Sequence, residues 1–334
     1  MSGTGAKTRY LFIRLLEACN AKCFMCGFAG LRDDYRFSLA EFSDILPQAR
    51  ALGVEIIRFT GGEPLLHRDL PALVAAGTAA GMKMSVITNG YLLTRKLDAL
   101  SRAGLAQVIV SLDGATAESH DRFRHTPDLF RRAVAGLEMA RDLGILTRVN
   151  TVAGPHNYTE LPALQRQLTQ WGVGQWELSA IKQDLRVRYP DPDHVRAVCD
   201  PIYRTDPSAT LVPIGKRFYG NTAVEQSLYF DAGIPPRPSQ PHCLVAGNAL
   251  YLDGKAGLGF ACSLLPHRNA GESGGGVKMR TERGWMLDRP EFTDHASVFR
   301  AAGPSRCKGC SSSAAGYSDA VAALGAHAVD PWYF

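Results

Sequence analysis

The sequence predicts an α/β fold in which parallel strands alternate with helices. Six strand-like apolar runs alternate with helical patterns over residues 9–180, and strands that are joined through helices pair in parallel. Polar motifs follow directly after these strands, at the carboxyl ends where parallel α/β folds place their chemistry. The pattern fits either a doubly wound sheet or a full or partial barrel.

Capping and turn residues place the individual elements. We expect strands at residues 9–16, 55–59, 83–88, 107–112, 146–151 and 175–180. Helices are expected at 38–52, where Ser38 and Glu41 form a capping box, and at 69–80, 94–103, 130–143 and 159–171. Beyond residue 193 the pattern loosens, with a helix expected at 221–230 and a strand-turn-strand at 249–262 around Asp253 and Gly254. We expect a domain boundary near residue 235.

Composition and charge indicate a globular protein with a large core. The chain has 334 residues, of which 46% are hydrophobic. Residues 1–8 lack the apolar stretch of a signal peptide, and no run is long enough for a membrane helix, so we expect a cytoplasmic protein without a membrane partner. The net charge of +5 is mild, and scattered arginine pairs such as Arg122 and Arg124 favour solvated surface over a nucleic-acid site.

The cysteines cluster in a way that indicates metal binding. A reducing compartment keeps thiols free, so eight cysteines are expected to be metal ligands or reactive groups. Cys19, Cys23 and Cys26 lie within eight residues, on a loop that leaves the first strand. Structural zinc sites take four ligands, and most iron-sulfur clusters take four cysteines. A loop with three cysteines therefore leaves one metal position open for a ligand from outside the chain.

The C-x3-C-x2-C spacing of these cysteines resembles that of the radical SAM superfamily, whose members bind S-adenosylmethionine (SAM). The resemblance implies a SAM-binding 4Fe-4S cluster, a one-electron reductant such as flavodoxin or ferredoxin, and a partial (β/α)6 barrel, which we place at residues 8–235. The segment Gly61-Gly62-Glu63-Pro64 looks like the superfamily motif that holds the amino group of SAM. The glycines would let the backbone approach the ligand closely, and Glu63 would pair with the ammonium.

Later strand ends offer further candidate contacts for SAM. Asn89, Ser111 and Asp113 resemble the ribose-side contacts of the superfamily, and Asn150 is a weaker candidate of the same kind. Local turn capping explains Asn89 and Asp113 equally well. Met25 stands where many relatives carry an aromatic residue, and either side chain can pack on adenine.

A second set of cysteines follows the expected barrel. The turn at Asp253-Gly254 would bring Cys243 and Cys262 to the same end of a ribbon, and Cys307 and Cys310 complete four ligands. Such a site can hold zinc or an iron-sulfur cluster. The arrangement resembles the twitch module, a shortened SPASM module found in a subset of radical SAM enzymes. The resemblance implies one auxiliary 4Fe-4S cluster in residues 236–320, followed by a tail at 321–334.

Four further residues are candidates on the substrate side. Cys199, on an apparent helix, is expected to be a small buried hydrophobe, and the alternative is a hydrogen-atom donor in an epimerase-type reaction. Lys182, Arg186 and Arg188 follow the sixth strand and are candidates for binding a carboxylated substrate, with solvated surface as the alternative.

Two short segments favour one branch of the superfamily. Residues 14–19 and 121–127 look most like the cytosylglucuronate decarboxylases of nucleoside antibiotic pathways. This resemblance implies hydrogen abstraction from the sugar moiety of a small-molecule substrate, with net exchange of a carboxylate for hydrogen. A dehydrogenase or epimerase of an aminoglycoside or aminocyclitol is the main alternative. A peptide-modifying enzyme and a non-catalytic metal-binding protein are the remote alternatives.

Overall fold

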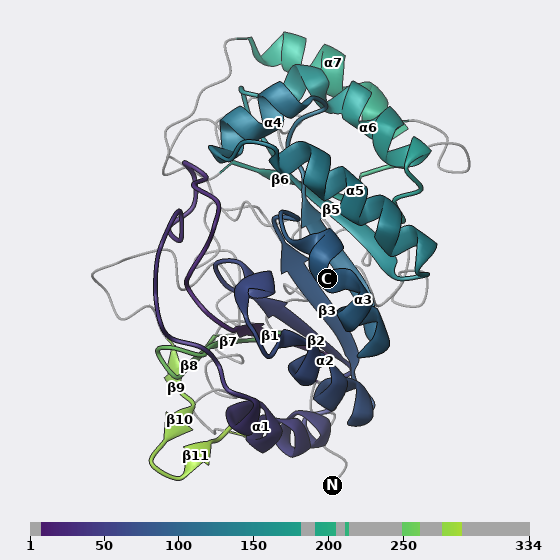
Figure 1. Cartoon of the computed structure of the whole chain (residues 1–334). Coiled ribbons are helices and arrows are strands. Elements are labelled where there is room, and N and C mark those ends of the chain that lie inside the picture. The colour runs from purple at the N-terminus through teal and green to yellow at the C-terminus, as the bar shows by residue number, and fades with distance from the viewer. Residues whose placement is uncertain (1–7, 182–190, 205–210, 214–248, 261–275, 289–334) are drawn as a thin grey trace, which may run out of the picture.

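The computed structural model describes residues 8–181, 191–204, 211–213, 249–260 and 276–288. Within these residues a nine-stranded sheet has the order β6-β5-β4-β3-β2-β1-β7-β8-β9 (Figure 1). The first six strands are parallel: β1 (Tyr10–Arg14), β2 (Ile56–Thr60), β3 (Lys83–Thr88), β4 (Leu105–Ser111), β5 (Leu146–Ala153) and β6 (Gln175–Ala180). Their sequential order is the one expected for a barrel, because a doubly wound sheet reverses its order at a switch point.

Helices follow the strands along the chain. They are α1 (Leu39–Ala51), α2 (Leu70–Ala79), α3 (Leu93–Arg102), α4 (Ala117–Arg124), α5 (Leu129–Asp142), α6 (Leu161–Gln170) and α7 (Pro192–Arg204), with single turns η1 (Pro64–Leu66) and η2 (Tyr158–Glu160). Helix α1 contacts α2, α2 contacts α3, α5 contacts both α3 and α4, and α6 contacts α7. The expected strands and helices up to residue 180 are confirmed with small shifts of their ends. The expected capping box is also present, since the Glu41 N–H donates to Ser38 Oγ at 3.1 Å and the Ser38 N–H donates to Glu41 Oε2 at 2.9 Å.

The short helix α4 was not expected from the sequence. Its residues, Ala-Glu-Ser-His-Asp-Arg-Phe-Arg, contain no apolar stripe of helical period. Thr116 caps its first turn by accepting a hydrogen bond from the Ser119 N–H at 3.2 Å. The helix ends at His125, which adopts the left-handed conformation with φ of 47°.

Alternate residues of each strand lie on two faces with different chemistry. The face opposite the helices carries a buried polar network beside apolar residues such as Ile109: Arg58 donates to Ser85 at 3.2 Å and to Gln107 at 3.0 Å, and Gln107 donates to Gln175 at 3.2 Å. Neighbouring strands lie about 4.8 Å apart, so the Arg58–Gln107 and Gln107–Gln175 bonds each cross an intervening strand, as expected if the sheet curves toward this face. The face under the helices carries buried apolar side chains: Leu11, Ile13, Ile57, Phe59, Met84, Val86, Val108, Val110, Val149 and Trp176.

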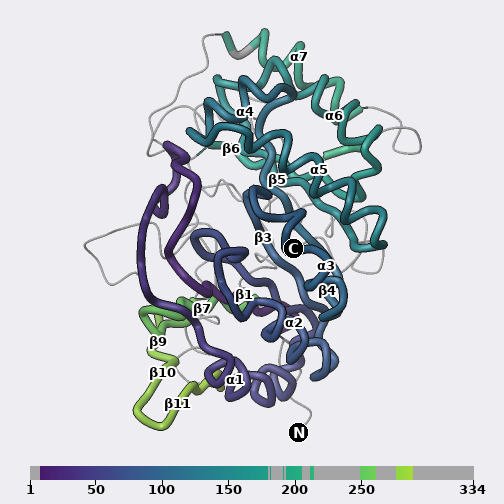
Figure 2. The backbone as a smooth tube through the Cα atoms, in the orientation of Figure 1, coloured from purple at the N-terminus to yellow at the C-terminus, as the bar shows by residue number. Residues whose placement is uncertain are grey.

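The strand-turn-strand expected at 249–262 is present in its described part, and it extends the main sheet. β7 (Ala249–Asp253) pairs in parallel with β1, and Tyr251 stacks on Phe12 with ring centroids 4.2 Å apart. β8 (Leu258–Phe260) and β9 (Val277–Lys278) continue the sheet in antiparallel fashion. Two further short strands, β10 (Arg280–Thr281) and β11 (Gly284–Trp285), form a separate hairpin beside α1 (Figure 2).

Several sequence-based expectations lie outside the described residues, namely the helix at 221–230, the four cysteines of the second set, and the basic residues Lys182, Arg186 and Arg188. Among the residues that are described, no helix has the length and apolar character needed to cross a membrane.

Candidate active site

The loop that joins β1 to α1, residues 15–38, carries Cys19, Cys23 and Cys26 and is called the cysteine loop below. Its two ends are tied together, because the Phe37 N–H donates to the Leu15 carbonyl at 2.8 Å. Its far end reaches α4, where the Lys22 N–H donates to the Arg124 carbonyl at 3.3 Å (Figure 1). The loop is therefore held over the carboxyl ends of the strands, where the sequence predicts the site.

Each of the three sulfur atoms in the cysteine loop has a hydrogen-bond donor directed at it. Hydrogen bonds of this kind stabilise the thiolate, which is the form that binds metals. The donors are the Ala21 N–H for Cys19 at 3.4 Å, the Phe28 N–H for Cys26 at 3.4 Å, and Arg124 Nη1 for Cys23 at 3.9 Å.

Burial acts against the thiolates while no metal is bound. It raises the pKa of Cys19 to about 11, and it raises the pKa of Cys23 against the opposing charge of Arg124. Both thiols are therefore neutral at pH 7, and iron binding would displace their protons. In the described part of the chain, no three His, Cys, Asp or Glu side chains are grouped so as to hold a single metal ion. A four-iron cluster presents separate iron atoms to separate thiolates, so its ligands need not converge on one point.

The two glycines of the Gly-Gly-Glu-Pro turn pack against the backbone of the cysteine loop. A Cβ atom at Gly61, whose φ is 147°, would lie 2.3 Å from the Leu16 carbonyl oxygen. A Cβ atom at Gly62 would lie 2.2 Å from the Ala18 carbonyl oxygen. The sequence predicted a close approach of a ligand at these glycines, and the structure adds a close approach of the loop itself. No other residue type fits at Gly62 without moving the loop.

Glu63 is fully buried between the ends of β2 and β3. Its carboxylate accepts hydrogen bonds from Thr88 Oγ1 at 2.7 Å, from the Asn89 N–H at 2.7 Å and from the Leu65 N–H at 3.0 Å. Burial nevertheless raises the pKa of Glu63. A carboxylate offers about four acceptor positions, so one is left for a cation such as the ammonium predicted for this site. Pro64 begins η1 directly after Glu63.

Asn89 lies against the cysteine loop. Its side chain donates to Asn20 Oδ1 at 2.8 Å and approaches Cys19 Sγ at 4.0 Å, while its own oxygen accepts from the Tyr91 N–H at 2.9 Å. The last of these bonds is the turn capping that the sequence left open as an alternative. The structure therefore places Asn89 beside the first cysteine, and its predicted contact with the ribose stays a prediction.

The remaining predicted SAM contacts lie around the mouth of the sheet. Ser111 and Asn150 are directly opposite one another on β4 and β5, and both are half-buried. Asn150 Oδ1 accepts a hydrogen bond from Arg148 Nε at 3.0 Å. Met25 is half-buried in the cysteine loop. These placements leave all three available for contact with a ligand.

Asp113 has different partners from those the sequence predicted. Its carboxylate accepts from the Val152 N–H at 2.8 Å and from Arg124 Nε at 2.6 Å, and it has no exposed surface. The Asp113 N–H donates to His120 Nδ1 at 3.0 Å. Burial lowers the pKa of His120 to about 3, so this imidazole is neutral and carries its proton on Nε2. Asp113 is thus held within the chain by Arg124 and the Val152 N–H, and its predicted contact with ribose stays a prediction.

The solvated surface expected for Arg122 and Arg124 is wrong for Arg124. The Arg122 side chain is 72% exposed, whereas that of Arg124 is 9% exposed and paired with Asp113. A signal for this difference exists in the sequence, because His120 and Arg124 are four residues apart and so share one face of α4, which is the buried face. Because α4 is not predicted from the sequence, the spacing of His120 and Arg124 could not be read as one face of a helix.

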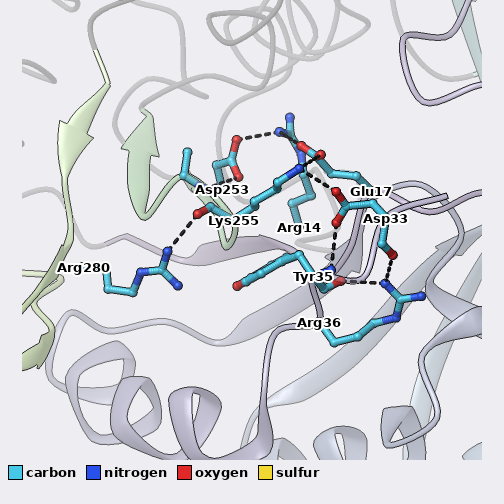
Figure 3. Close-up of polar contacts among 9 residues, drawn as sticks. Arg14, Glu17, Asp33, Tyr35, Arg36, Asp253, Lys255 and Arg280 are labelled. Atoms are coloured by element: carbon cyan, nitrogen blue, oxygen red, sulfur yellow. Dashed lines mark hydrogen bonds and ion pairs between the residues drawn. The ribbon is translucent and has the colours of Figure 1, made fainter. Parts of the chain in front are cut away.

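A network of charged side chains joins the cysteine loop to the turn between β7 and β8 (Figure 3). Lys255 donates to Asp33 Oδ2 at 2.6 Å and to Glu17 Oε2 at 2.7 Å, so it bridges the two arms of the loop. Arg14, at the end of β1, pairs with Asp253 at 2.6 Å. The hydrogen bonds to Asp33 and Glu17 raise the pKa of Lys255, and Lys255 lowers the pKa of Asp33. No local pattern predicts these contacts, because the partners are more than 200 residues apart.

Cys199 is completely buried in the core, where its thiol donates to the Tyr158 carbonyl at 3.6 Å. Burial raises its pKa to about 12. These surroundings favour the packing role expected for Cys199 and give no support to the alternative role of a hydrogen-atom donor.

Replacing Gly62 by Ala should displace the cysteine loop, because the added methyl group overlaps the Ala18 carbonyl. We expect a loss of about 1–3 kcal/mol in the free energy of unfolding and poor retention of iron after anaerobic reconstitution. Gly27→Ala is the matched control in the same loop, since nothing lies within 4 Å of its added methyl group. Equal iron content and stability in the two variants would contradict this account.

Replacing Lys255 by Met should loosen the cysteine loop without disturbing the core, because the Lys255 side chain is 44% exposed. We expect iron to be lost several-fold faster to a chelator. The contact should also weaken at acidic pH, as Asp33 protonates on passing below its lowered pKa. Lys278→Met, at an exposed lysine on β9, is the control. Identical rates of iron loss in the two variants would show that the bridge does not hold the loop.

Comparison with known proteins identifies the region that contains these features. Residues 13–168 match the family model described as the Radical SAM superfamily. An AdoMet-dependent heme synthase of Methanosarcina barkeri is 33% identical over 156 residues, which cover 46% of this chain and 45% of that protein. A GTP 3',8-cyclase of Stenotrophomonas maltophilia is 38% identical over 150 residues, which cover 43% of this chain and 45% of that protein. The chain thus spans about half the length of the curated relatives that it matches.

Solved structures show the same fold at lower sequence identity. SuiB of Streptococcus suis, in a crystal structure with bound S-adenosylmethionine, matches with a TM-score of 0.63 at 15% identity, covering 90% of this chain and 67% of that chain. The structure of native anSMEcpe with bound AdoMet and Kp18Cys peptide matches with a TM-score of 0.61 at 16% identity, covering 90% of this chain and 86% of that chain. The family match and the curated relatives support the assignment of residues 13–168 to the radical SAM superfamily.

Proposed function

We propose that this chain is a radical SAM enzyme that abstracts hydrogen from a sugar-containing small molecule. The observation that carries the first part is the cysteine loop, in which three sulfurs with directed donors lie over the strand ends beside the buried Glu63. The family match over residues 13–168 supports the same conclusion.

The residues present fit a SAM-binding 4Fe-4S cluster. Cys19, Cys23 and Cys26 would hold the cluster, and three protein thiolates leave one iron for SAM. Glu63 supplies a buried negative charge that is incompletely compensated, since its pKa is raised in spite of three hydrogen bonds. A positively charged amino group placed beside it would complete that compensation.

When bound, the cluster would pass one electron from an external reductant to SAM. Cleavage of SAM would then supply a radical that can take a hydrogen atom from the substrate. The chain's own residues would bind and orient SAM and the substrate. Glu63 and the strand-end residues Asn89, Ser111 and Asn150 are proposed to hold SAM, with Met25 against adenine. The buried polar residues of the sheet, among them the ion pair of Arg148 with Glu177, are proposed to face the substrate.

For the substrate, we favour a glucuronosyl nucleoside such as cytosylglucuronate and its decarboxylation. The segments 14–19 and 121–127 support this choice through their resemblance to cytosylglucuronate decarboxylases. The relative named GTP 3',8-cyclase also has a nucleotide substrate, and its name places the reaction at a sugar position. Lys182, Arg186 and Arg188 are the proposed partners of the carboxylate. Oxidation or epimerisation of an aminocyclitol or aminoglycoside is the second candidate.

Anaerobic incubation of the reconstituted enzyme with SAM, a one-electron reductant and candidate sugars tests both parts of the proposal. We expect 5'-deoxyadenosine and a product lighter by carbon dioxide, measured by liquid chromatography and mass spectrometry. Loss of two hydrogens or an unchanged mass would instead identify a dehydrogenase or an epimerase. Cys23→Ala should abolish formation of 5'-deoxyadenosine, while Cys199→Ala should retain it. Cleavage of SAM by the Cys23 variant would refute the role of the cysteine loop.

We also propose that Cys243, Cys262, Cys307 and Cys310 hold an auxiliary 4Fe-4S cluster, as the resemblance to the twitch module implies. Anaerobically purified protein should then contain about eight irons per chain. Cys307→Ala combined with Cys310→Ala should remove about half of them and leave SAM binding intact. Stoichiometric zinc with about four irons would contradict this proposal and indicate a structural zinc site.

A further inference from the structure

Arg124 is the last residue of α4, and its side chain points into the protein. The side chain is 9% exposed, in contrast to the 72% exposure of Arg122 on the opposite face of the same helix. Arg124 also contacts the cysteine loop through its backbone, because its carbonyl accepts a hydrogen bond from the Lys22 N–H at 3.3 Å. The residue therefore belongs to the wall of the site.

The guanidinium of Arg124 is held in place by Asp113. Arg124 Nε donates to Asp113 Oδ2 at 2.6 Å, and the other oxygen of Asp113 is fixed by the Val152 N–H at 2.8 Å. The backbone of Asp113 is fixed in turn, since its N–H donates to His120 and its carbonyl accepts from Asn157 at 2.7 Å. Because both the side chain and the backbone of Asp113 are fixed, Arg124 cannot move away from the loop without breaking a buried ion pair.

The free end of the guanidinium points at the middle cysteine of the loop. Arg124 Nη1 lies 3.9 Å from Cys23 Sγ, and the thiol of Cys23 is buried. Arginine stays charged at any pH that a protein tolerates. The Asp113–Arg124 pair is neutral as a whole, and it is Arg124 that donates toward the Cys23 sulfur.

We propose that Arg124 is a positioning residue that raises the reduction potential of the cluster through the Cys23 sulfur. A cluster becomes more negative when it accepts an electron, and a fixed positive charge next to a ligand sulfur stabilises that reduced state. Hydrogen bonds to the sulfurs and the local charge are known determinants of iron-sulfur potentials. This inference rests on the proposed function only in assuming that Cys23 binds a cluster.

The test is a redox titration of the reconstituted protein, followed by electron paramagnetic resonance in the absence of SAM. The relevant cluster is recognised as the one whose signal changes when SAM is added. Arg124→Gln keeps most of the side-chain volume and removes the charge. We expect at least a tenfold fall in the ratio of reduced to oxidised cluster at a given potential, which corresponds to a shift of about 59 mV to more negative values for one electron.

Two further variants complete the design. Arg122→Gln removes an exposed charge from the same helix and should leave the potential unchanged. Arg124→Lys keeps a charge that can still pair with Asp113 but loses the fork of donors, and should give a smaller shift in the same direction. If Arg124→Gln does not fold, the reduction potential of the Arg124→Lys variant tests the proposal instead.

An unchanged potential in the folded Arg124 variants would overturn the inference. So would weaker SAM binding with no change in potential, because Arg124 would then act on SAM. Failure of this inference can be told apart from failure of the proposed function by measuring the wild-type protein. Cluster binding and SAM cleavage by the wild type do not depend on how the Arg124 variants behave. A wild-type protein without any cluster would refute both.

Discussion

The close contact between Gly62 and the Ala18 carbonyl fixes how the cysteine loop sits on the sheet. The end of β2 then places Glu63, whose carboxylate is held by Thr88 and Asn89 at the end of β3. Asn89 reaches back to the loop. The cysteine loop, the end of β2 and the end of β3 thus each contact the other two. These contacts determine where the sulfur atoms lie. A site built on rigid strand ends holds its geometry better than one built on the loop alone.

Two charged contacts hold the loop from its other sides, and they differ in strength. Arg124 is paired with Asp113 away from water, where removing one partner leaves an uncompensated charge and is strongly destabilising. Lys255 bridges Glu17 and Asp33 at the surface, where solvent screens the charges. The buried pair is suited to setting the electrostatics near Cys23. The exposed bridge is suited to restraining the loop.

Much of the fold could be predicted from the sequence because periodicity is local. The six parallel strands, the helices between them and the Ser38 capping box all follow from patterns within one segment. Helix α4 could not be predicted, since its eight residues carry no apolar stripe and its burial depends on the cysteine loop packed against it. The parallel pairing of β7 with β1 could not be predicted either, because nothing in residues 249–253 specifies a partner 239 positions away.

The candidate site was predictable to the extent that its chemistry lies in short motifs. Cys19, Cys23, Cys26 and Glu63 were found in this way, and the structure places them together at the strand ends. The predicted ribose contact of Asp113 rests on a resemblance to the superfamily, and the structure adds a buried partner, Arg124, that the motif does not indicate. A motif does not reveal which of its polar groups form hydrogen bonds or ion pairs with other residues of the chain.

The pairing of β7 with β1 also has a consequence for how the chain is made. β1 lies between β2 and β7 in the sheet, so one of its edges gains a partner within the first sixty residues and the other edge only when residues 249–253 emerge from the ribosome. Lys255 arrives at the same late point. For most of its synthesis the chain therefore carries the cysteine loop without the Lys255 bridge between Glu17 and Asp33, and only the contacts with β2, β3 and α4 are available to hold it.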